Sequence, residues 1–428
     1  MSPLLLGGAS FLLMFVLIFL QVPIAIAMIL AGTLTSAILI GLDPALEIIP
    51  IEIFHALSSP ELALVIMFVL MGNLASLAEL PRDIYRLSAS LFGHRPGGLA
   101  MTTIVSSAGF GAICGSSVAT TATMTKMALP EMMRYGYGNK LAAGSIAAGS
   151  TLGIIVPPSI VLILYGILTE QAINKLFVAA VIPAILGVAF YLFAIVYVVR
   201  RNPDEAPALD RVGADVRINA ARQAFSFLVL VLCVGGGLYS GFLTINEAAS
   251  VGVTLSLLIA WKRGKIGKSS LNRSILDTAS TTGMIYLVLI GAGIYSYSMT
   301  LTGLPAEIVK VIGNSGLPPL VIILLLEVMY IILGSIFDTV AAMVVTLPFV
   351  FPLVTGLGYD PIWWGIINVI VMEIGLITPP IGMNVFVLYG IKPELGLKNI
   401  YLGVIPFAIA DVGRLLLLTF VPVLMIIN

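Results

Sequence analysis

A chain of 428 residues that is 59% hydrophobic and only 10% charged does not have the composition of a soluble protein, because soluble domains carry charge on about a quarter of their residues. Its formal net charge of zero indicates no class of partner, and no nucleic-acid ligand is expected. Apolar stretches of about 20 residues recur from end to end, and each is long enough to cross the hydrocarbon core of a bilayer. The composition therefore predicts an all-α, polytopic membrane protein.

In chain order, charged or Pro/Gly-rich joints separate ten predicted membrane-spanning segments. These are residues 4–20, 22–42, 59–78, 139–165, 173–199, 222–242, 245–261, 274–300, 361–390 and 400–426. The first segment has no basic residue before it and no small-residue cleavage site. We therefore expect it to be a membrane helix rather than a removable signal peptide.

Two further apolar stretches, 97–133 and 318–355, have a glycine/serine break near the middle, at AICGSSVAT and ILGSIFDT. We interpret both as re-entrant hairpins, which enter and leave the membrane on the same side. Non-helical backbone at membrane depth is tolerated only where it is buried in protein or lines a wet cavity. The two hairpins are therefore expected in the interior of the protein.

The distribution of lysine and arginine agrees with this topology. If both hairpins are re-entrant, 17 of the 21 basic residues fall on one side, in the joints at 79–96, 131–140, 200–222, 262–273 and 391–399. The opposite joints hold only Lys175 and Lys310. The positive-inside rule then places the basic side in the cytoplasm. We expect a multi-pass protein of a bacterial inner membrane with both termini in the periplasm.

The predicted segments also repeat. Each half of the chain consists of three crossings, a hairpin, a broken crossing (139–165 or 361–390) and one further crossing. Five full crossings per half give the second half the opposite orientation. We therefore expect a first inverted repeat at 1–200, a cytoplasmic linker at 201–221 and a second inverted repeat at 222–428. Inverted repeats with discontinuous helices are typical of secondary transporters.

Both broken crossings contain the same device. GSTLGIIVPPSI (149–160) and EIGLITPPIGMN (373–384) each place a glycine four residues before a pair of prolines. Proline lacks an N–H and its ring clashes with the preceding turn, so two in a row unwind a helix and free the carbonyls just before them. A freed carbonyl in a membrane is costly unless something meets it. A hard cation such as Na⁺, which prefers oxygen ligands, is expected at Gly153–Val156 and Gly375–Thr378.

Each break is expected to lie across from a hairpin tip that is rich in hydroxyl groups. The tips offer Ser116, Ser117, Thr120 and Thr121 in the first half and Ser335, Asp338 and Thr339 in the second. Half-helix N-termini at such tips carry partial positive charge that suits a substrate carboxylate. The hydroxyl residues can also be ordinary helix-packing residues. Asp338 is a candidate ligand because an acid in an apolar segment is costly, or it caps the second arm of its hairpin.

Several other ionisable residues lie in apolar segments, and four of them are considered for a role. Glu327 and Glu373 can bind protons or hydrogen-bond a neighbouring helix. Asp411 and Arg414 are three residues apart on one predicted helix, and we expect them to neutralise each other.

By sequence, Gly115-Ser116 in the first tip corresponds to Gly334-Ser335 in the second.

Four segments resemble the large membrane subunit of TRAP (tripartite ATP-independent periplasmic) transporters, the DctM-like family: FGAICGSSVATTATM, AAGSTLGIIVPPSIVLILYG, ILGSIFDTVAAMVVTLPFVFPLV and EIGLITPPIGMNVFVL. The resemblance implies the fold of the ion-transporter superfamily, with a scaffold and an elevator-like transport domain. It also implies uptake of an organic acid anion, usually driven by Na⁺. The implied partners are a small four-helix membrane subunit, as a separate chain, and a periplasmic binding protein. No organic cofactor is implied.

Carried onto this chain, the resemblance implies two Na⁺ sites with the substrate between the hairpin tips. The first Na⁺ site comprises Cys114, Gly115, Ser116, Ser117, Gly153, Val156 and Pro157. The second comprises Gly334, Ser335, Asp338, Gly375, Thr378 and Met383. The substrate residues are Ser117, Thr120, Ser159, Asp338, Thr339 and Asn384. Cys114 stands where many relatives have serine, and a thiol is a poorer Na⁺ ligand than a hydroxyl.

Three other classes of protein share parts of this pattern. A stand-alone Na⁺- or H⁺-coupled dicarboxylate carrier of the same superfamily has the same architecture but needs no binding protein. An enzyme is not expected, since the chain has no HExxH motif, no close acidic pair for metal-assisted chemistry and two cysteines without metal or redox spacing. A purely structural subunit would leave the polar hairpin tips unexplained.

Overall fold

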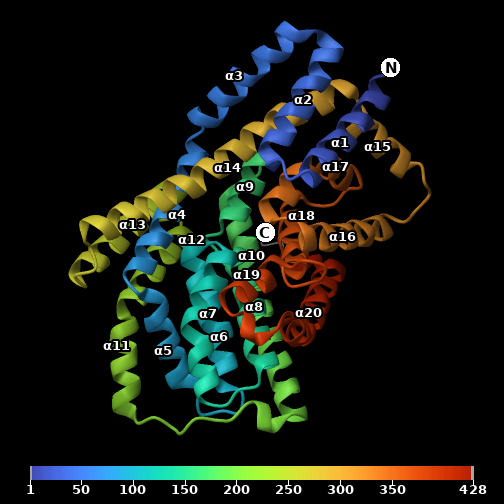
Figure 1. Cartoon of the computed structure of the whole chain (residues 1–428). Coiled ribbons are helices and arrows are strands. Elements are labelled where there is room, and N and C mark those ends of the chain that lie inside the picture. Colours follow the sequence, from blue (N-terminus) through green and yellow to red (C-terminus); the bar gives the residue numbers. More distant parts are fainter. Residues whose placement is uncertain (1, 426–428) are drawn as a thin grey trace.

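The computed structural model describes residues 2–425, and every regular element in that range is a helix (Figure 1). The first half contains α1 (Pro3–Phe19), α2 (Ile24–Ile40), α3 (Leu42–Ser58), α4 (Pro60–Leu77), α5 (Leu80–Phe92), α6 (Gly98–Cys114), α7 (Ser117–Arg134), α8 (Asn139–Thr151), the 3₁₀ turn η1 (Leu152–Ile154), α9 (Ile160–Leu168), α10 (Ile173–Arg201) and the 3₁₀ turn η2 (Pro203–Glu205). Residues 1 and 426–428, the chain ends to which the prediction of periplasmic termini refers, lie outside the described range.

The second half begins with α11 (Ala214–Val231), which continues through the π-helical turn η3 (Leu232–Gly236) into α12 (Gly237–Tyr239). It continues with α13 (Ile245–Lys262), α14 (Lys268–Thr302), α15 (Leu304–Gly313), α16 (Pro319–Ile336), α17 (Thr339–Gly356), α18 (Pro361–Gly375), α19 (Met383–Ile391), the 3₁₀ turn η4 (Pro393–Leu395), α20 (Leu397–Phe420) and the 3₁₀ turn η5 (Pro422–Leu424).

Length and composition allow seven of the described helices to cross a membrane. They are α4, α10, the continuous stretch α11–α12, α14, α16, α17 and α20. Four shorter helices are also apolar: α1, α2, α6 and α18. The chain is therefore a multi-pass membrane protein.

Both predicted hairpins consist of two helices separated by two residues. Between α6 and α7, Gly115 adopts a φ of 61°, and Ser116 caps α7 by accepting a hydrogen bond from Ala119 N at 3.4 Å. Between α16 and α17, Asp338 Oδ2 accepts from Val340 N at 3.0 Å and caps α17. A side-chain oxygen at this position satisfies one of the free N–H groups at the start of a helix.

Each proline pair interrupts a helix, as the sequence predicts. Helix α8 tightens into η1 and ends before Pro157-Pro158, and α9 begins two residues later. Helix α18 ends at Gly375, and α19 begins only after Pro379-Pro380 and Gly382. Both Pro–Pro peptide bonds are cis.

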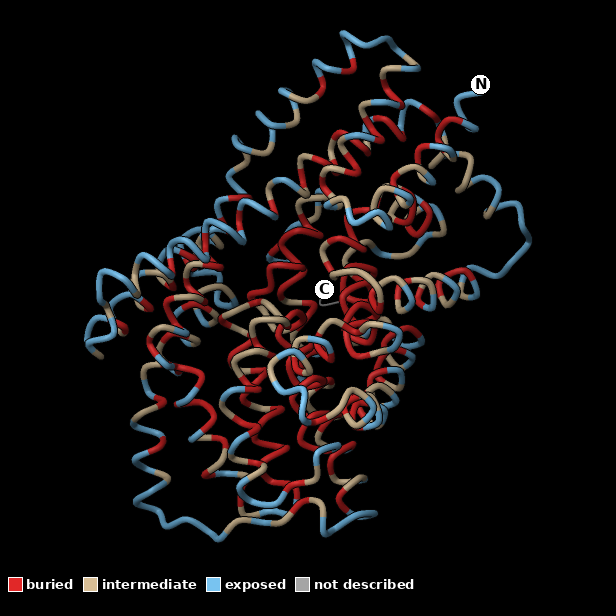
Figure 2. The backbone as a smooth tube through the Cα atoms, viewed as in Figure 1, coloured by how far each residue is buried: buried red, intermediate tan, exposed pale blue. Residues whose placement is uncertain are grey.

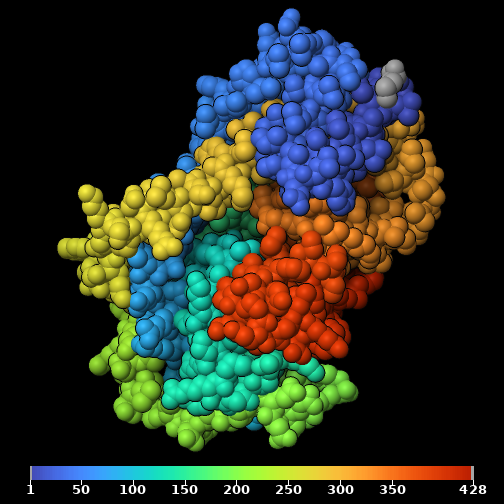
Figure 3. All heavy atoms as spheres, in the orientation of Figure 1, coloured from blue at the N-terminus to red at the C-terminus, as the bar shows by residue number. Residues whose placement is uncertain are grey.

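The second part of each broken helix packs against the other half of the chain. Helix α9 contacts α17 and α18, and α19 contacts α7 and α8. Figure 3 shows the red residues of α19 seated on the teal segment that contains α7. Helix α20 then runs along α8 so closely that a methyl group on Gly144 would lie 2.1 Å from Gly403 O. The hairpins and breaks therefore form one buried body, which is red in Figure 2.

The remaining helices surround this body. The 35-residue α14 packs along α2, α3 and α4, while α13 packs on α4 and α11 on α5. Helices α3 and α11 are mostly exposed and appear pale blue in Figure 2. Many exposed side chains on the outer helices are large and apolar, which suits contact with lipid tails.

Four of the five basic joints contact one another. The contacts are Lys265 Nζ–Glu79 Oε1 (2.6 Å), Gly138 N–Glu205 O (2.9 Å) and Leu209 N–Gly93 O (3.0 Å). These contacts connect the four joints around α5, in the region that we call the basic end.

The structure corrects the sequence analysis in several joints. Helices α3, α5 and α15 form where joints were predicted, and the predicted linker 201–221 contains η2 and the first two turns of α11. Helix α5 explains why these were missed. It buries Leu80, Ile84 and Ser88 on one face and exposes Arg82 and Arg86 on the other. A short amphipathic helix depends on packing, here against α6 and α11, and gives no long apolar signal.

Arg263 fixes three helices at the basic end. Its Nη1 lies 2.6 Å from Asp83 Oδ2 and donates to Ala78 O, and its Nη2 donates to Gln223 O at 3.3 Å. The Asp83 side chain is only 9% exposed. We expect Arg263→Ala to lower the free energy of unfolding by about 2 kcal/mol, because a mostly buried carboxylate loses its partner. Thermal melting of the detergent-purified protein measures this loss.

Lys265→Ala is the matched control. Lys265 also pairs at 2.6 Å, but it and Glu79 are 40% and 46% exposed. Such an exposed pair contributes less than about 1 kcal/mol. Equal losses in both variants would contradict the role assigned to Arg263.

Candidate functional site

The first candidate site lies where the hairpin α6–α7 meets the break between α8 and α9. A methyl group on Gly153 would lie 3.1 Å from Gly111 Cα, 3.3 Å from Thr120 Oγ1 and 3.7 Å from Ser116 O. Thr120 Oγ1 donates to Ser116 O at 2.7 Å, so the lone pairs of the threonine oxygen remain available to a cation. The predicted residues Ser116, Thr120 and Gly153 are therefore neighbours.

The second site repeats this arrangement with α16–α17 and the break between α18 and α19. Ser335 O accepts hydrogen bonds from Ile381 N (3.2 Å) and Gly382 N (2.9 Å), so the hairpin is bonded directly to the break. A methyl group on Gly382 would lie 3.0 Å from Thr378 O. The structure thus brings together the predicted residues Gly334, Ser335, Gly375 and Thr378.

Gly111 lies in the first site, although no sequence motif points to it. A methyl group on Gly111 would lie 2.2 Å from Gly153 Cα, and one on Gly375 would lie 2.7 Å from Gly334 Cα. By packing, the counterpart of Gly334 is therefore Gly111, which corrects the alignment with Gly115. The first tip has one more residue between the packed glycine and the helix cap than the second, and this insertion hid the match.

Each break leaves carbonyls free, and two of them stand at the same position in the two halves. Within residues 2–425, Val156 O and Thr378 O, directly before the two proline pairs, accept no hydrogen bond. The described residues contain no group of three His, Cys, Asp or Glu that could hold a metal ion. A cation bound here would therefore be held by hydroxyl and carbonyl oxygens, which are the ligands that hard cations prefer.

The substrate residues predicted in the first half lie at the starts of α7 and α9. Ser117 is the first residue of α7 and is buried. The Ser159 hydroxyl donates to Ile154 O and accepts from Leu162 N at 3.3 Å, so its proton is already used inside the break. A methyl group on Gly115 would lie 3.2 Å from the nitrogen that begins α9, which brings the hairpin tip to this point.

Asn384 joins the two sites. Its Nδ2 donates to Ala147 O on α8 at 3.1 Å, and its backbone N donates to Leu376 O in the second break. The residue is fully buried, and Oδ1 has no hydrogen-bond partner in the described part of the chain. Buried polar atoms are nearly always paired, so this amide oxygen is suited to a bound donor. Asp338 and Thr339 lie at the start of α17.

Cys114, Pro157 and Met383 have packing roles in this structure. A methyl group on Gly72 of α4 would lie 3.0 Å from Cys114 Cα. Pro157 lines a small apolar cavity with Met71. Met383 begins α19. These contacts place Cys114 and Pro157 against the outer helices.

The buried acids have partners on neighbouring helices. Arg414 Nη2 donates to Glu373 Oε2 and lies 2.9 Å from Asp411 Oδ1, and all three residues are fully buried. Arg414 therefore contacts two carboxyl groups and not one, because Glu373 from α18 binds the same guanidinium as the expected partner Asp411. Glu327 accepts a hydrogen bond from Thr419 Oγ1 at 2.6 Å, which is the helix-bonding role that the sequence left open.

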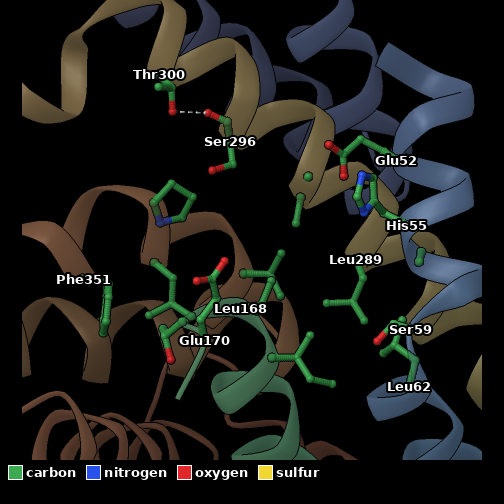
Figure 4. A pocket seen from close by; sticks show the side chains of 18 of the residues that line it. Glu52, His55, Ser59, Leu62, Leu168, Glu170, Leu289, Ser296, Thr300 and Phe351 are labelled. Atoms are coloured by element: carbon green, nitrogen blue, oxygen red, sulfur yellow. Dashed lines mark hydrogen bonds between the residues drawn. The ribbon is translucent and has the colours of Figure 1, made fainter. Parts of the chain in front are cut away.

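Two large cavities flank the buried body. One, of about 620 Å³, lies between α3, α14, α17 and the end of α9 (Figure 4), and its lining includes Glu52, His55, Ser59, Glu170 and Phe351. The other, of about 670 Å³, lies at the basic joints between α5 and α7, and its lining includes Arg82, Arg86, Lys126, Glu131 and Arg134. Neither lining contains a predicted site residue.

Known proteins match nearly the whole chain. The family model "Tripartite ATP-independent periplasmic transporter, DctM component" matches residues 11–424. The C4-dicarboxylate TRAP transporter large permease protein DctM of Pseudomonas aeruginosa is 32% identical over 92% of this chain and 91% of its own length. The isethionate TRAP transporter permease protein DctMQ of Oleidesulfovibrio alaskensis is 29% identical over 94% of this chain but only 63% of its own length.

A solved structure shares the fold. The YdaH transporter of Alcanivorax borkumensis superposes with a TM-score of 0.63 over 99% of this chain and 98% of its own, at 14% sequence identity. The relatives are named as transporter permeases rather than enzymes. The chain therefore belongs to the DctM family of tripartite ATP-independent periplasmic transporter components.

Proposed function

We propose that this chain is the large membrane subunit of a TRAP transporter and carries an organic acid anion inward together with Na⁺. A periplasmic binding protein delivers the anion, and a small membrane subunit completes the membrane complex in a bacterial inner membrane. One observation carries this proposal: each half of the chain packs a helix break against a hairpin tip, and Val156 O and Thr378 O are left free at matching positions.

The donor set supports Na⁺ as the coupling ion. In the first site, Ser116 O, Thr120 Oγ1 and the carbonyls of the break surround Gly153. In the second, Ser335 and Thr378 lie beside Gly375. These oxygens are uncharged, so a monovalent cation adds its own positive charge to each site. That charge helps to balance an anion bound between the tips.

The helix starts support an anionic substrate. Helices α7 and α17 each begin at a hairpin tip, and the N-terminal end of a helix attracts negative charge. The two relatives described above are named for a C4-dicarboxylate and for isethionate, and both compounds are organic acid anions. We therefore assign the substrate to this chemical class and place it near Ser117, Thr339 and Asn384.

The packing supports movement of the buried body as one unit. Because α9 lies on α17 and α18 and α19 lies on α7 and α8, neither break can move without the opposite hairpin. The body slides against the outer helices α2, α4, α13 and α14. The two cavities lie on different sides of the body, and the four cations at the basic end suit an anion that leaves there. We therefore propose an elevator movement of the inverted repeats, in which the buried body moves as one unit past the outer helices.

The permease DctMQ supports a second membrane component. Its length extends well beyond the part that this chain matches, since only 63% is covered. We assign the extra segment to the role of the small subunit. A stand-alone carrier remains the alternative, because it would use the same breaks and tips without a binding protein.

Uptake into proteoliposomes tests the proposal. The chain and its small partner are reconstituted, and uptake of labelled organic acids is measured with and without the binding protein, under either a Na⁺ or a proton gradient. We expect uptake only with both Na⁺ and the binding protein. Uptake without the binding protein identifies a stand-alone carrier, and uptake driven by protons alone excludes Na⁺ coupling.

Gly375→Ala tests the second cation site. The new methyl group would lie 2.6 Å from Gly334 C, so the hairpin must move away from the break. Such overpacking costs about 1–3 kcal/mol, and we expect Na⁺-stimulated uptake to fall roughly tenfold or more. Gly390→Ala is the control, because nothing lies within 4 Å of a methyl group there. Normal uptake by Gly375→Ala would refute this site.

Asp338→Asn separates the two roles proposed for this residue. An asparagine can still cap α17, as Asp338 does through Val340 N, but it carries no charge. If the carboxylate is a cation ligand, Asp338→Asn melts like the wild type but needs a much higher Na⁺ concentration for half-maximal uptake. Asp338→Ala loses the cap as well, so its melting temperature should also fall. Wild-type Na⁺ dependence in Asp338→Asn would leave the cap as the only role.

A further inference from the structure

A row of polar groups crosses the core behind the first break. Thr151 Oγ1 donates to Ala148 O at 2.8 Å and lies 3.1 Å from the Tyr191 hydroxyl. The Tyr191 hydroxyl in turn hydrogen-bonds Asp411 Oδ2. Thr151, Tyr191 and Asp411 are all fully buried, so no bulk water can complete these bonds.

The row needs one more proton than its hydroxyl groups supply. Three hydrogen bonds join Ala148 O, Thr151 Oγ1, Tyr191 Oη and Asp411 Oδ2 in sequence, and each requires a proton. Threonine and tyrosine hydroxyls provide one proton each, and a carbonyl oxygen provides none. Only the carboxyl group of Asp411 can supply the third. It then donates to Tyr191, which donates to Thr151, which donates to Ala148 O.

The charges in the same cluster require the same proton. Arg414 lies between Glu373 and Asp411, and no side-chain atom of the three is exposed. Two carboxylates and one guanidinium would leave a net negative charge inside the membrane, and an unbalanced charge there is costly. A protonated Asp411 leaves one neutral Glu373–Arg414 pair. The count of protons and the count of charges therefore agree, although they rest on different contacts.

We propose that Asp411 is a proton-binding site whose carboxyl group is held in the acid form in the folded protein. Its Oδ2 donates to Tyr191, and its carbonyl-like Oδ1 faces Arg414 Nη2 at 2.9 Å. Glu373 is the ionised partner, because its Oε2 receives the guanidinium hydrogen bond and no hydroxyl group in the described residues bonds to it.

The bound proton has a positioning role. Thr151 precedes Gly153 by two residues, and Glu373 precedes Gly375 by two residues. The row Thr151–Tyr191–Asp411–Arg414–Glu373 therefore joins equivalent positions of the two breaks through α8, α10, α20 and α18. Loss of the proton would break this row and place a negative charge behind both breaks.

Few other ionisable groups face the cluster. Helix α10 contributes Tyr191, α18 contributes Glu373, and α20 contributes Arg414 next to Asp411 itself. Helix α8 faces it with the uncharged Thr151. Helix α19, which also packs on α20, contains no charged residue. The protonation of Asp411 therefore depends on Arg414, Tyr191 and Glu373.

Two substitutions separate the acid form from the ionised form. Asp411→Asn keeps one oxygen for Arg414 and an N–H for Tyr191, and it is neutral, so it reproduces the proposed acid. We expect Asp411→Asn to melt above the wild type at neutral pH, because unfolding lets the wild-type Asp411 release its proton and the variant has no such proton to release. Glu373→Gln removes the ionised partner of Arg414 and should lower the melting temperature by several degrees. If Asp411 were ionised, Asp411→Asn would be destabilised as strongly as Glu373→Gln, and the proposal would fail.

The pH dependence of melting gives a second readout. An aspartate that stays protonated in the folded protein but ionises in the unfolded chain lowers the free energy of unfolding as the pH rises above about 4. The wild type should therefore lose stability relative to Asp411→Asn as the pH rises from about 4 through neutral. An identical pH dependence of melting in both proteins would overturn the assignment.

Infrared spectroscopy of the purified chain tests the proton directly, whether or not a variant changes stability. The difference spectrum between wild type and Asp411→Asn should contain the C=O stretching band of a buried carboxylic acid, shifted in heavy water. Glu327→Gln is the control, because Glu327 is a buried acid outside the cluster, and this variant should retain the Asp411 band. If the band is absent from the spectrum of Glu373→Gln but present in that of Asp411→Asn, the proton is on Glu373 and the proposal is refuted.

Discussion

The whole architecture follows from one constraint: a polar backbone group inside a membrane must meet a partner within the protein. The proline pairs at 157–158 and 379–380 unwind two apolar helices. Lipid cannot satisfy the freed carbonyls, so the surrounding helices must enclose them. The hairpins α6–α7 and α16–α17 pack against the breaks, and their own breaks are capped by Ser116 and Asp338, while Val156 O and Thr378 O have no partner in the described residues. Most of the interrupted backbone thereby lies in the buried body, although Pro379 and Pro380 of the second break are exposed.

Glycine makes this enclosure close enough to be useful. Gly111 meets Gly153 and Gly334 meets Gly375 at distances that no side chain would permit. Small residues at helix contacts are a common solution in membranes, where apolar side chains gain little by leaving lipid. Here the close approach also brings hydroxyl and carbonyl oxygens of the hairpin to the break. The same contact therefore serves packing, and it supplies the oxygens of the proposed cation sites.

Charge neutrality in the core connects the two halves. Arg414 from α20 is held by Glu373 from α18, and the neighbouring Asp411 reaches Tyr191 on α10. A buried guanidinium is tolerated only with such partners, and partners from several helices fix their relative positions. Asn384 adds a direct hydrogen bond from the second break to Ala147 of the first half. These contacts explain why the breaks act as parts of one body.

The sequence by itself determined the features that depend on neighbouring residues. A proline pair breaks a helix whatever surrounds it, and a Ser or Asp at a helix start caps it, so both breaks and both hairpin tips could be predicted. The tertiary structure alone decided which distant residues meet. Gly111 was missed because one extra residue in the first tip shifts its match to Gly334, and the Glu373–Arg414 pair joins residues 41 apart on different helices. Helix α5 was missed because its stability comes from burying one face, which only the folded neighbours provide.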